Sequence, residues 1–206
     1  MLSRVAIAVG ATLIFASKAT LACKGPTQIF ADNFQTQEPA WYGTLTIGGG
    51  LATLPASPRQ HNLAFYGGKS IDSGDACVDV TGPSGLQDPT KVRVGIMFGF
   101  TDFANYYAFV IDEGGRAAVI GAHNGGSLVP VTSRPAASIK TGPGIANTLR
   151  VTWKGNAVST FINDQPFVTF PLHYGLNNSF IGLYGGNDEP ATTTFQFSNL
   201  KVTNGP

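Results

Sequence analysis

The chain has 206 residues, and its 13 Lys and Arg side chains nearly balance its 12 Asp and Glu side chains. Charged residues make up only 12% of the chain, whereas glycine occurs 26 times. This balance excludes the strongly basic surface that attracts nucleic acids or anionic membranes. The composition favours an all-β domain with tight turns and uncharged polar faces.

The first segment, residues 1–22, has the features of a secretory signal peptide. A basic start at Arg4 precedes an apolar run over residues 5–16, and small residues follow at Thr20 and Ala22. The apolar run is shorter than the roughly 20 residues that span a bilayer, and no later stretch is long enough. We therefore expect one domain, residues 23–206, exported to the periplasm or the extracellular space without a membrane span.

Two cysteines, Cys23 and Cys77, follow the expected cleavage point. In an oxidising compartment such a pair usually forms a disulfide, which here would tie the start of the domain to residues 73–80. The alternative is lipidation of Cys23, because "TLAC" loosely resembles a lipoprotein cleavage site. Lipidation would leave Cys77 unpaired, and Thr20 stands where an aliphatic residue is normally required.

The remainder of the chain is predicted to form short strands, because glycine or proline interrupts nearly every window long enough for a helix. Every second residue is apolar from Val92 to Phe98 and again from Leu149 to Trp153, which predicts strands with one buried face. Turns at 113–115, 124–126 and 163–164 suit hairpins. The predicted strands are residues 28–34, 41–47, 51–56, 61–68, 76–82, 91–100, 106–112, 116–122, 127–132, 148–153, 157–163, 166–172, 180–186 and 192–203.

This number and spacing of strands predict two antiparallel sheets packed face to face. The last strand is expected to return beside the first and close its sheet. The apolar alternation of residues 147–170 indicates scaffold, so that a functional site would lie on an outer face or at the loops.

The motifs then indicate a superfamily. They are "ADNF" (31–34), Trp41, "NYYAFVID" (105–112), "NTLRVTWKGNAVSTFINDQPF" (147–167), "IGLYGG" (181–186) and "FQFSNLKV" (195–202). From about Phe30 to Val202 the chain resembles the concanavalin A-like jelly rolls of lectins and glucanases. More narrowly, it is similar to laminin G-like domains of bacterial exported proteins, including those named for 3-keto-disaccharide hydrolase activity. The resemblance implies a two-sheet jelly-roll β-sandwich and a carbohydrate ligand.

A catalytic site of the family-16 glucanase type is not expected. Those enzymes place their carboxylates at alternate positions of one strand, about 7 Å apart, and the chain has no Glu-x-Asp-x-Glu pattern. Asp112 and Glu113 precede two glycines, where acidic residues commonly form turns. Asp188 and Glu189 are weak candidates for a structural calcium ion, and no cofactor is expected to be required. His61, His123 and His173 lack a short metal-ligand spacing.

A sugar-binding site needs aromatic rings for the apolar faces of the sugars and polar groups for their hydroxyls. We predict Tyr66, Asn105, Tyr107 and Tyr184 as ligand-binding residues. Within residues 105–109, strand alternation allows only one of the two tyrosines to lie on the same side as Asn105.

The sequence thus predicts an exported protein that binds a glycan without cleaving it. The alternative is a glycoside hydrolase or lyase of the 3-keto-disaccharide type, in which Asp112, Glu113 and Asp188 meet a histidine in a groove. A third interpretation is a structural or adhesive protein outside the cytoplasm, which would require an exposed apolar patch.

Overall fold

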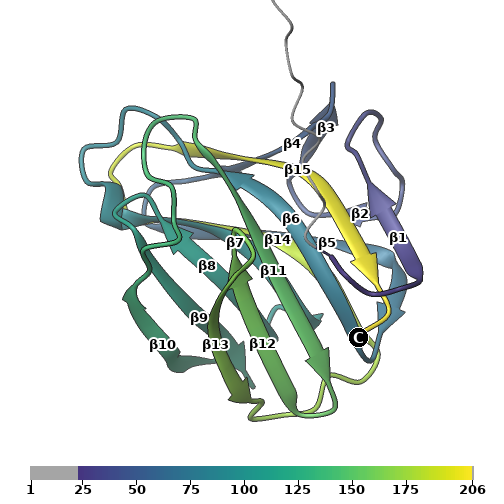
Figure 1. The fold of residues 1–206 in the computed structure, drawn as a ribbon. Helices are drawn as coiled ribbons and strands as arrows, with labels where there is room; N and C mark the ends of the chain where they lie inside the picture. Colours follow the sequence, from purple (N-terminus) through teal and green to yellow (C-terminus); the bar gives the residue numbers. More distant parts are fainter. Residues whose placement is uncertain (1–22, 206) are drawn as a thin grey trace, which may run out of the picture.

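Two antiparallel β-sheets pack face to face in the computed structural model, which describes residues 23–205, apart from the side chains of 128–131 (Figure 1). The predicted signal peptide, residues 1–22, lies outside the described residues. A short 3₁₀ helix, η1 (Pro89–Lys91), precedes strand β7. The described range contains no helix with the length and hydropathy needed to cross a membrane. The prediction of a two-sheet all-β sandwich is confirmed.

Sheet A has eight strands, and several strands that are neighbours in it come from distant parts of the chain. The closing strand pairs with the first strand along residues 28–32, as the sequence predicted. The strands of sheet A lie in the order β13 (Gln165–Pro171), β12 (Ala157–Ile162), β11 (Ala146–Lys154), β6 (Gly74–Thr81), β15 (Thr193–Thr203), β4 (Leu51–Ala56) and β3 (Thr46–Gly48), and β1 (Gln28–Asp32) also pairs with β15.

Sheet B has seven strands and contains the meander predicted for the middle of the chain. Strand β14, near the end of the sequence, inserts between β7 and β5. The order is β10 (Gly126–Pro135), β9 (Arg116–His123), β8 (Asn105–Asp112), β7 (Val92–Asp102), β14 (Ser179–Asn187), β5 (Gln60–Ile71) and β2 (Trp41–Tyr42).

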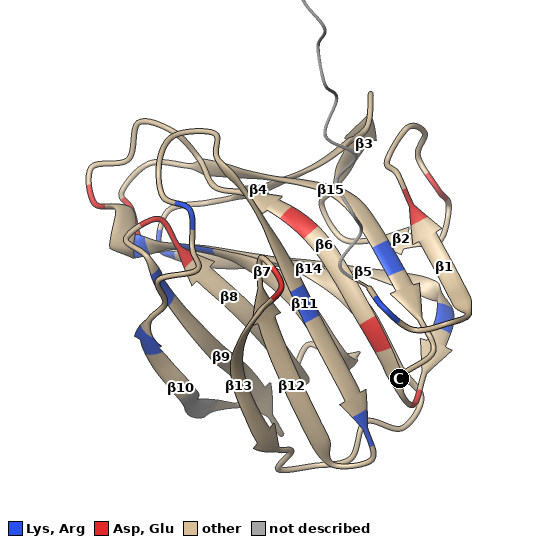
Figure 2. Cartoon of the chain, viewed as in Figure 1, with Lys and Arg blue, Asp and Glu red and all other residues tan. Residues whose placement is uncertain are grey.

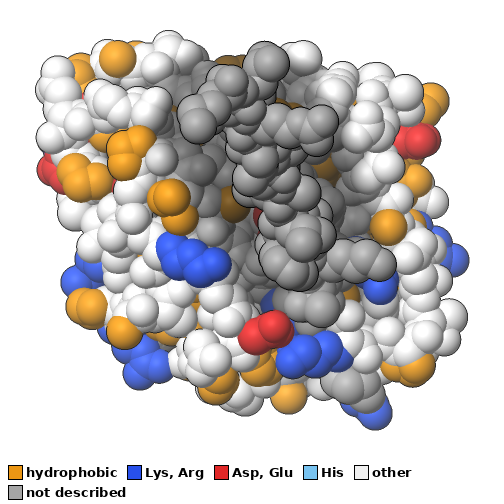
Figure 3. Space-filling model, turned by 45° about the horizontal axis from the view of Figure 1, so that its top comes forward, with side chains coloured by type: hydrophobic (Ala, Val, Ile, Leu, Met, Phe, Trp, Pro, Cys, Tyr) orange, Lys and Arg blue, Asp and Glu red, His pale blue; other side chains and the backbone are white. Residues whose placement is uncertain are grey.

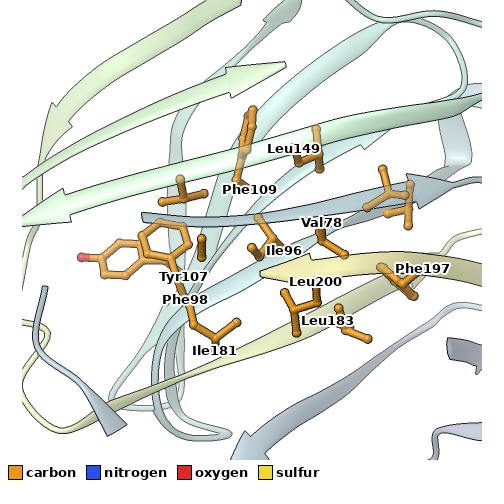
Figure 4. Packing of buried hydrophobic residues seen from close by; sticks show 14 of the residues in the cluster. Val78, Ile96, Phe98, Tyr107, Phe109, Leu149, Ile181, Leu183, Phe197 and Leu200 are labelled. Carbon is orange, nitrogen blue, oxygen red and sulfur yellow. The ribbon is translucent and has the colours of Figure 1, made fainter. Parts of the chain in front are cut away.

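The main core lies between the sheets and contains the inward-facing residues of both (Figure 4). Phe98 and Phe109 of sheet B pack in this cluster with Leu149 and Phe197 of sheet A, and all four are at most 1% exposed. Every second residue from Val92 to Phe98 and from Leu149 to Trp153 belongs to the same cluster. The alternation read from the sequence therefore identified the buried face of both strands.

The hairpin turns have the backbone conformations that their residues predicted. Asn163 and Asp164 both have positive φ angles, 51° and 66°, and so do Asn124 and Gly125, 49° and 76°. Asn, Asp and Gly tolerate this region better than other residues, and two consecutive positive φ angles match the twist of the flanking strands. These turns set the register of the strands that they join.

The start of the domain is attached to the outer face of sheet A. Cys23 forms a disulfide with Cys77 of β6, with the two Cα atoms 5.5 Å apart. The disulfide prediction is confirmed, and the sulfur of Cys23 is not available for lipidation. The backbone N–H of Lys24 donates to the Asp75 carboxylate, 2.8 Å away, on the same face.

Charged side chains are sparse on the described surface, in agreement with the composition. Figure 2 shows acidic positions within β6 and a basic position within β11, on the sheet to which the N-terminal segment is attached. On the face shown in Figure 3, Lys, Arg, Asp and Glu side chains are scattered among backbone and uncharged polar groups. No long-range electrostatic field of one sign is therefore expected to dominate recognition.

Candidate functional site

The outer faces of the two sheets differ in chemistry. On sheet A, hydrogen bonds join polar side chains of neighbouring strands, such as Thr148 to Asp79 and Ser159 to Thr169. The outer face of sheet B carries a second apolar cluster, whose members alternate along the strands with residues of the main core. The eight residues at its centre are at most 8% exposed, so they form a packed layer on the sheet and not an exposed apolar patch. This cluster contains Leu63, Met97, Phe100, Tyr106, Ala108, Val110, Ala118 and Tyr184, with Phe65, Ile120, Ala122 and Phe180 at its margin.

A row of polar residues crosses one end of this outer face, and we call it the polar row: His61, Arg93, Asp112 and Arg116. Arg93 pairs with Asp112 across β7 and β8 and with Gly186 across β7 and β14, and Gly186 pairs in turn with His61. Directly opposed residues of neighbouring strands lie about 5 Å apart. Between Arg93 and His61 the Tyr184 ring lies over Gly186, where a Cβ would be only 3.0 Å from that ring.

The next two rows are apolar. Val110 pairs with Gly95 and Ala118, and Tyr184 pairs with Gly95 and Leu63. One row further on, Met97 pairs with Ala108 and Gly182, and Gly182 pairs with Phe65. Small residues on the middle strands thus alternate with larger side chains toward β5.

Aromatic side chains gather at the other end of the face, and we call this group the aromatic platform: Tyr42, Phe65, Phe100, Phe103 and Phe180. Phe65 stacks on Tyr42 and on Phe100, with ring centroids 5.1 and 4.4 Å apart. Phe100 meets Phe103 edge-on at 5.5 Å, and Phe180 lies 5.9 Å from Phe65. Tyr42 and Phe103 remain 54% and 66% exposed. Rings supported by other rings in this way offer a firm apolar surface to a ligand.

A pocket of about 320 Å³ opens beside the polar row. Arg93, Asp112 and Arg116 line it together with Val110 and Ala118 of the outer face, and Thr90 and Ser133 contribute hydroxyl groups. The Arg116 backbone N–H donates to Oδ1 of Asp112 over 2.8 Å. The pocket therefore combines cations, a carboxylate and hydroxyls above an apolar floor.

Burial raises the pKa of Asp112 above its usual value, although hydrogen bonds from the Arg116 and Gly114 backbones and the charges of Arg116 and Arg93 act in the opposite direction. Asp112 is 8% exposed, so the loss of hydration of its carboxylate outweighs these favourable interactions. Backbone N–H groups thus hold the Asp112 carboxylate in place, while the Arg93 and Arg116 side chains line the pocket.

A polar cluster borders the aromatic platform at the β7–β8 turn, where Phe103 lies between Asp102 and Asn105. The Asn105 side chain donates to both Asp102 oxygens, 3.0 and 3.1 Å away, and contacts Nδ1 of His123 at 3.1 Å. The Asn124 backbone N–H donates to the Asn105 side-chain oxygen at 3.0 Å. Asn105 alternates with Tyr106 of the outer cluster, and His123 stacks on Tyr174 at the margin of the main core, with ring centroids 4.5 Å apart. This network therefore lies on the core side of sheet B and not on its outer face.

Another cavity, of about 450 Å³, lies at the loops and is lined mainly by residues 81–87 and 189–194. Two carboxylates hold the loop 82–88 at its ends. Glu113 accepts from the Gly82 backbone, and Glu189 accepts from the Asp88 backbone at 2.8 Å. Burial and the neighbouring charge of Asp112 raise the pKa of Glu113. Both glutamates therefore have a structural role, which is to bind the backbone of the loop 82–88.

The structure does not bring the four predicted ligand-binding residues together. Tyr66 packs against the main core between Phe30 and Trp41. Tyr107 is fully buried, and its hydroxyl accepts from the His173 backbone at 2.9 Å. Tyr184 lies on the outer face of sheet B and stacks on His61, whereas Asn105 belongs to the β7–β8 turn. Their role in binding stays a prediction, and Tyr106 is the tyrosine of the "NYYAF" segment that joins the outer cluster.

The other candidates also separate. Asp112 lies at the pocket, Glu113 lies at the loop 82–88, and Asp188 pairs with Arg93 at 3.6 Å. Glu189 is 4% exposed. Within residues 23–205 no group of three or more His, Cys, Asp or Glu side chains could hold a metal ion. A calcium ion at Asp188 and Glu189 stays a prediction.

Sequence reasoning missed most of the aromatic platform and the position of Arg93. Phe65, Phe100 and Phe180 belong to β5, β7 and β14, and only the strand pairing makes them neighbours. One local signal was present: strand alternation places Phe65 on the face opposite Ala64, and Arg93 on the face opposite Val92 and Val94.

Comparisons with known proteins address the fold. No protein-family model matches the sequence, and no curated protein matches it. Among solved structures, carbohydrate-binding module CBM66 from Bacillus subtilis has 15% sequence identity and a TM-score of 0.62, over 80% of this chain and 96% of that one. The carbohydrate recognition domain of Emp47p has 12% identity and a TM-score of 0.63, over 85% and 94% of the two chains.

An enzyme is also among the similar structures. The laminarinase catalytic domain from Thermotoga maritima has 9% identity and a TM-score of 0.60, over 85% of this chain and 96% of that one. Binding modules and hydrolases thus share this sandwich at very low sequence identity, so the likeness establishes the architecture and leaves the activity to the site. The resemblance stated from the sequence is confirmed at the level of the fold: the chain has the two-sheet jelly-roll fold of the concanavalin A-like type.

Proposed function

We propose that the protein binds a carbohydrate on the outer face of sheet B, outside the cytoplasm. The observation that carries this proposal is the aromatic platform, which shares one sheet face with the polar row. Sugars present apolar C–H faces and a rim of hydroxyls, so a site for them needs exposed rings with polar groups nearby. Tyr42 and Phe103 supply exposed rings, and Arg93 and Asp112 supply polar groups.

Export is part of the proposal. The Cys23–Cys77 disulfide supports it, because structural disulfides persist in oxidising compartments. The similar solved structures include a carbohydrate-binding module and a carbohydrate recognition domain, which supports a glycan as ligand. Binding does not require catalysis. Two-carboxylate hydrolysis needs a carboxyl pair about 5–9.5 Å apart across the scissile bond, and the predicted pair Asp112 and Glu113 serves two different places, the pocket and the loop 82–88.

A glycan array probed with the purified, disulfide-bonded protein tests the proposal, with product analysis on every glycan that is retained. Retention of an unchanged glycan is the expected result. Cleaved product would show that the protein is a hydrolase or lyase and not only a binding module. Silence across the array, with a normal thermal transition of the same sample, would contradict carbohydrate binding and favour an adhesive role for the aromatic platform.

A further inference from the structure

The pocket at the polar row contains more cationic than anionic charge. Arg93 and Arg116 both line it, and Asp112 is the acidic residue of its lining. Asp112 receives hydrogen bonds from the backbone N–H groups of Arg116 and Gly114. Among the described residues neither guanidinium forms an ion pair with this carboxylate, although the charges of both favour its ionised form.

The two guanidinium groups retain donors for a ligand. Each carries five N–H donors in a planar arrangement. Within the described residues, Arg116 uses one of them in a 3.4 Å hydrogen bond to the Ser133 carbonyl. Arg93 approaches Asp188 at 3.6 Å, and the two side chains are 43% and 58% exposed. An exposed ion pair of this kind contributes little to stability, so a ligand can take the place of Asp188 beside Arg93.

We propose that this pocket binds the carboxylate of an acidic sugar residue, so that the ligand is a saccharide containing uronic acid. The inference rests on the proposed carbohydrate binding and specifies its substrate class. A carboxylate matches the guanidinium fork through two parallel hydrogen bonds, which makes arginine the preferred partner. Thr90 and Ser133, at the margin of the pocket, provide hydroxyl groups for those of the sugar.

The position of the pocket suits one unit of a longer ligand. Strand β7 carries Arg93 at the pocket and Phe100 in the aromatic platform. At roughly 3.3 Å per residue, these two positions lie about 23 Å apart along the strand. An extended oligosaccharide can therefore place a charged unit at the arginines and rest other units on the rings.

Isothermal titration calorimetry with three probes tests this inference: tetragalacturonate, its methyl ester and neutral cellotetraose. We expect tetragalacturonate to bind about tenfold or more tightly than its ester, because hydrogen bonds to a charged group are stronger than hydrogen bonds between neutral groups. Arg93→Gln and Arg116→Gln should each reduce this preference, and high salt should weaken it. Lys154→Gln removes an exposed cation from the end of β11 in sheet A and should leave the preference unchanged.

Each contrary result has its own meaning. Equal affinity for the acid and the ester, or array binding restricted to neutral glycans, overturns the acidic ligand and leaves carbohydrate binding intact. A preference for the acid that survives both arginine substitutions overturns this pocket as its site. A folded protein that binds neither the three probes nor any array glycan refutes the proposed function itself.

Discussion

Arg150 binds the carboxylate of Asp75 through two hydrogen bonds, 2.7 and 2.9 Å long, on the outer face of sheet A. Asp75 is fully buried and Arg150 is 6% exposed. The Lys24 backbone N–H donates to the same carboxylate, and the Arg150 guanidinium lies 4.6 Å from the centre of the Phe161 ring. One buried carboxylate thus joins β6, β11 and the N-terminal segment.

Removing the arginine should leave this carboxylate buried without its cation. Arg150→Ala is expected to lower the free energy of unfolding by about 3–5 kcal/mol, the usual cost of breaking a buried ion pair. Denaturant unfolding monitored by tryptophan fluorescence measures the change, with exposed Lys154→Ala as the control. A loss below about 1 kcal/mol, the range of surface pairs, would contradict a stabilising role for the pair.

The disulfide should stabilise the fold through the loop that it closes. Cys23 and Cys77 are 54 residues apart in the sequence. When a disulfide closes a loop of this length, the lower entropy of the unfolded chain stabilises the folded protein by about 4 kcal/mol at 25 °C. The double variant Cys23→Ser/Cys77→Ser should show this loss in denaturant unfolding. A reducing agent should lower the unfolding midpoint of the wild-type protein but not that of the variant. Identical midpoints for both proteins without reductant would show that the loop closure contributes nothing.

Truncating an exposed ring of the aromatic platform should weaken glycan binding without unfolding the protein. Phe103→Ala removes a ring that is 66% exposed, so the loss of stability should stay within about 0.5 kcal/mol. Affinity should fall about fivefold or more, because aromatic anchors dominate binding energies. The matched control is Leu51→Ala, which shortens another exposed apolar side chain on β4 of sheet A. Equal affinities of both variants would exclude the platform from the site.

The raised pKa of Glu113 predicts a pH-dependent effect on stability. Burial and the charge of Asp112 make the ionised form less favourable in the folded protein than in the unfolded chain. The contribution of Glu113 to stability is thus fully present below its unfolded pKa and is lost as the pH rises through its folded pKa. Glu113→Gln keeps an acceptor for Gly82 and should raise the Tm at pH 7–8.

The increase in Tm should shrink as the pH approaches 4, where Glu113 is protonated in both states. Thermal unfolding of the two proteins from pH 3.5 to 8 measures the difference. Glu38→Gln, which makes the same substitution at an exposed position before β2, is the matched control. A variant less stable than wild type at pH 8 would show that the negative charge itself holds the loop 82–88.

Tyr107 provides a test of one predicted binding residue. Its ring is fully buried, and its hydroxyl accepts a hydrogen bond from the His173 backbone. Tyr107→Phe should lower the free energy of unfolding by about 1 kcal/mol, since it removes one buried acceptor. Glycan affinity, measured by calorimetry with a ligand from the array, should remain within twofold of wild type. A larger loss of affinity would support the prediction that Tyr107 is a binding residue.

Local patterns predicted much of the fold but not the site. In residues 105–109, alternation correctly separated the two tyrosines, but it did not tell which of them points to the core. The structure turns Tyr107 inward and Tyr106 outward, because the face with Phe109 and Ile111 packs against sheet A. A strand with apolar residues on both faces carries no local signal for this choice.

Apart from the predicted strand 41–47, which divides into β2 of sheet B and β3 of sheet A, the sequence by itself determined the strands, their turns, the disulfide partners and the two-sheet architecture. These features depend on neighbours within a few residues, on period-two alternation and on the pairing of two cysteines. Only the tertiary structure decided which side chains share the outer face of sheet B. Strand β14 separates β7 from β5 in the sheet, and this insertion aligns Arg93 with His61 and brings the Phe100 ring to 4.4 Å from the Phe65 ring. The physical reason is that the order of strands in a sheet depends on long-range packing, whereas strand formation follows from local alternation.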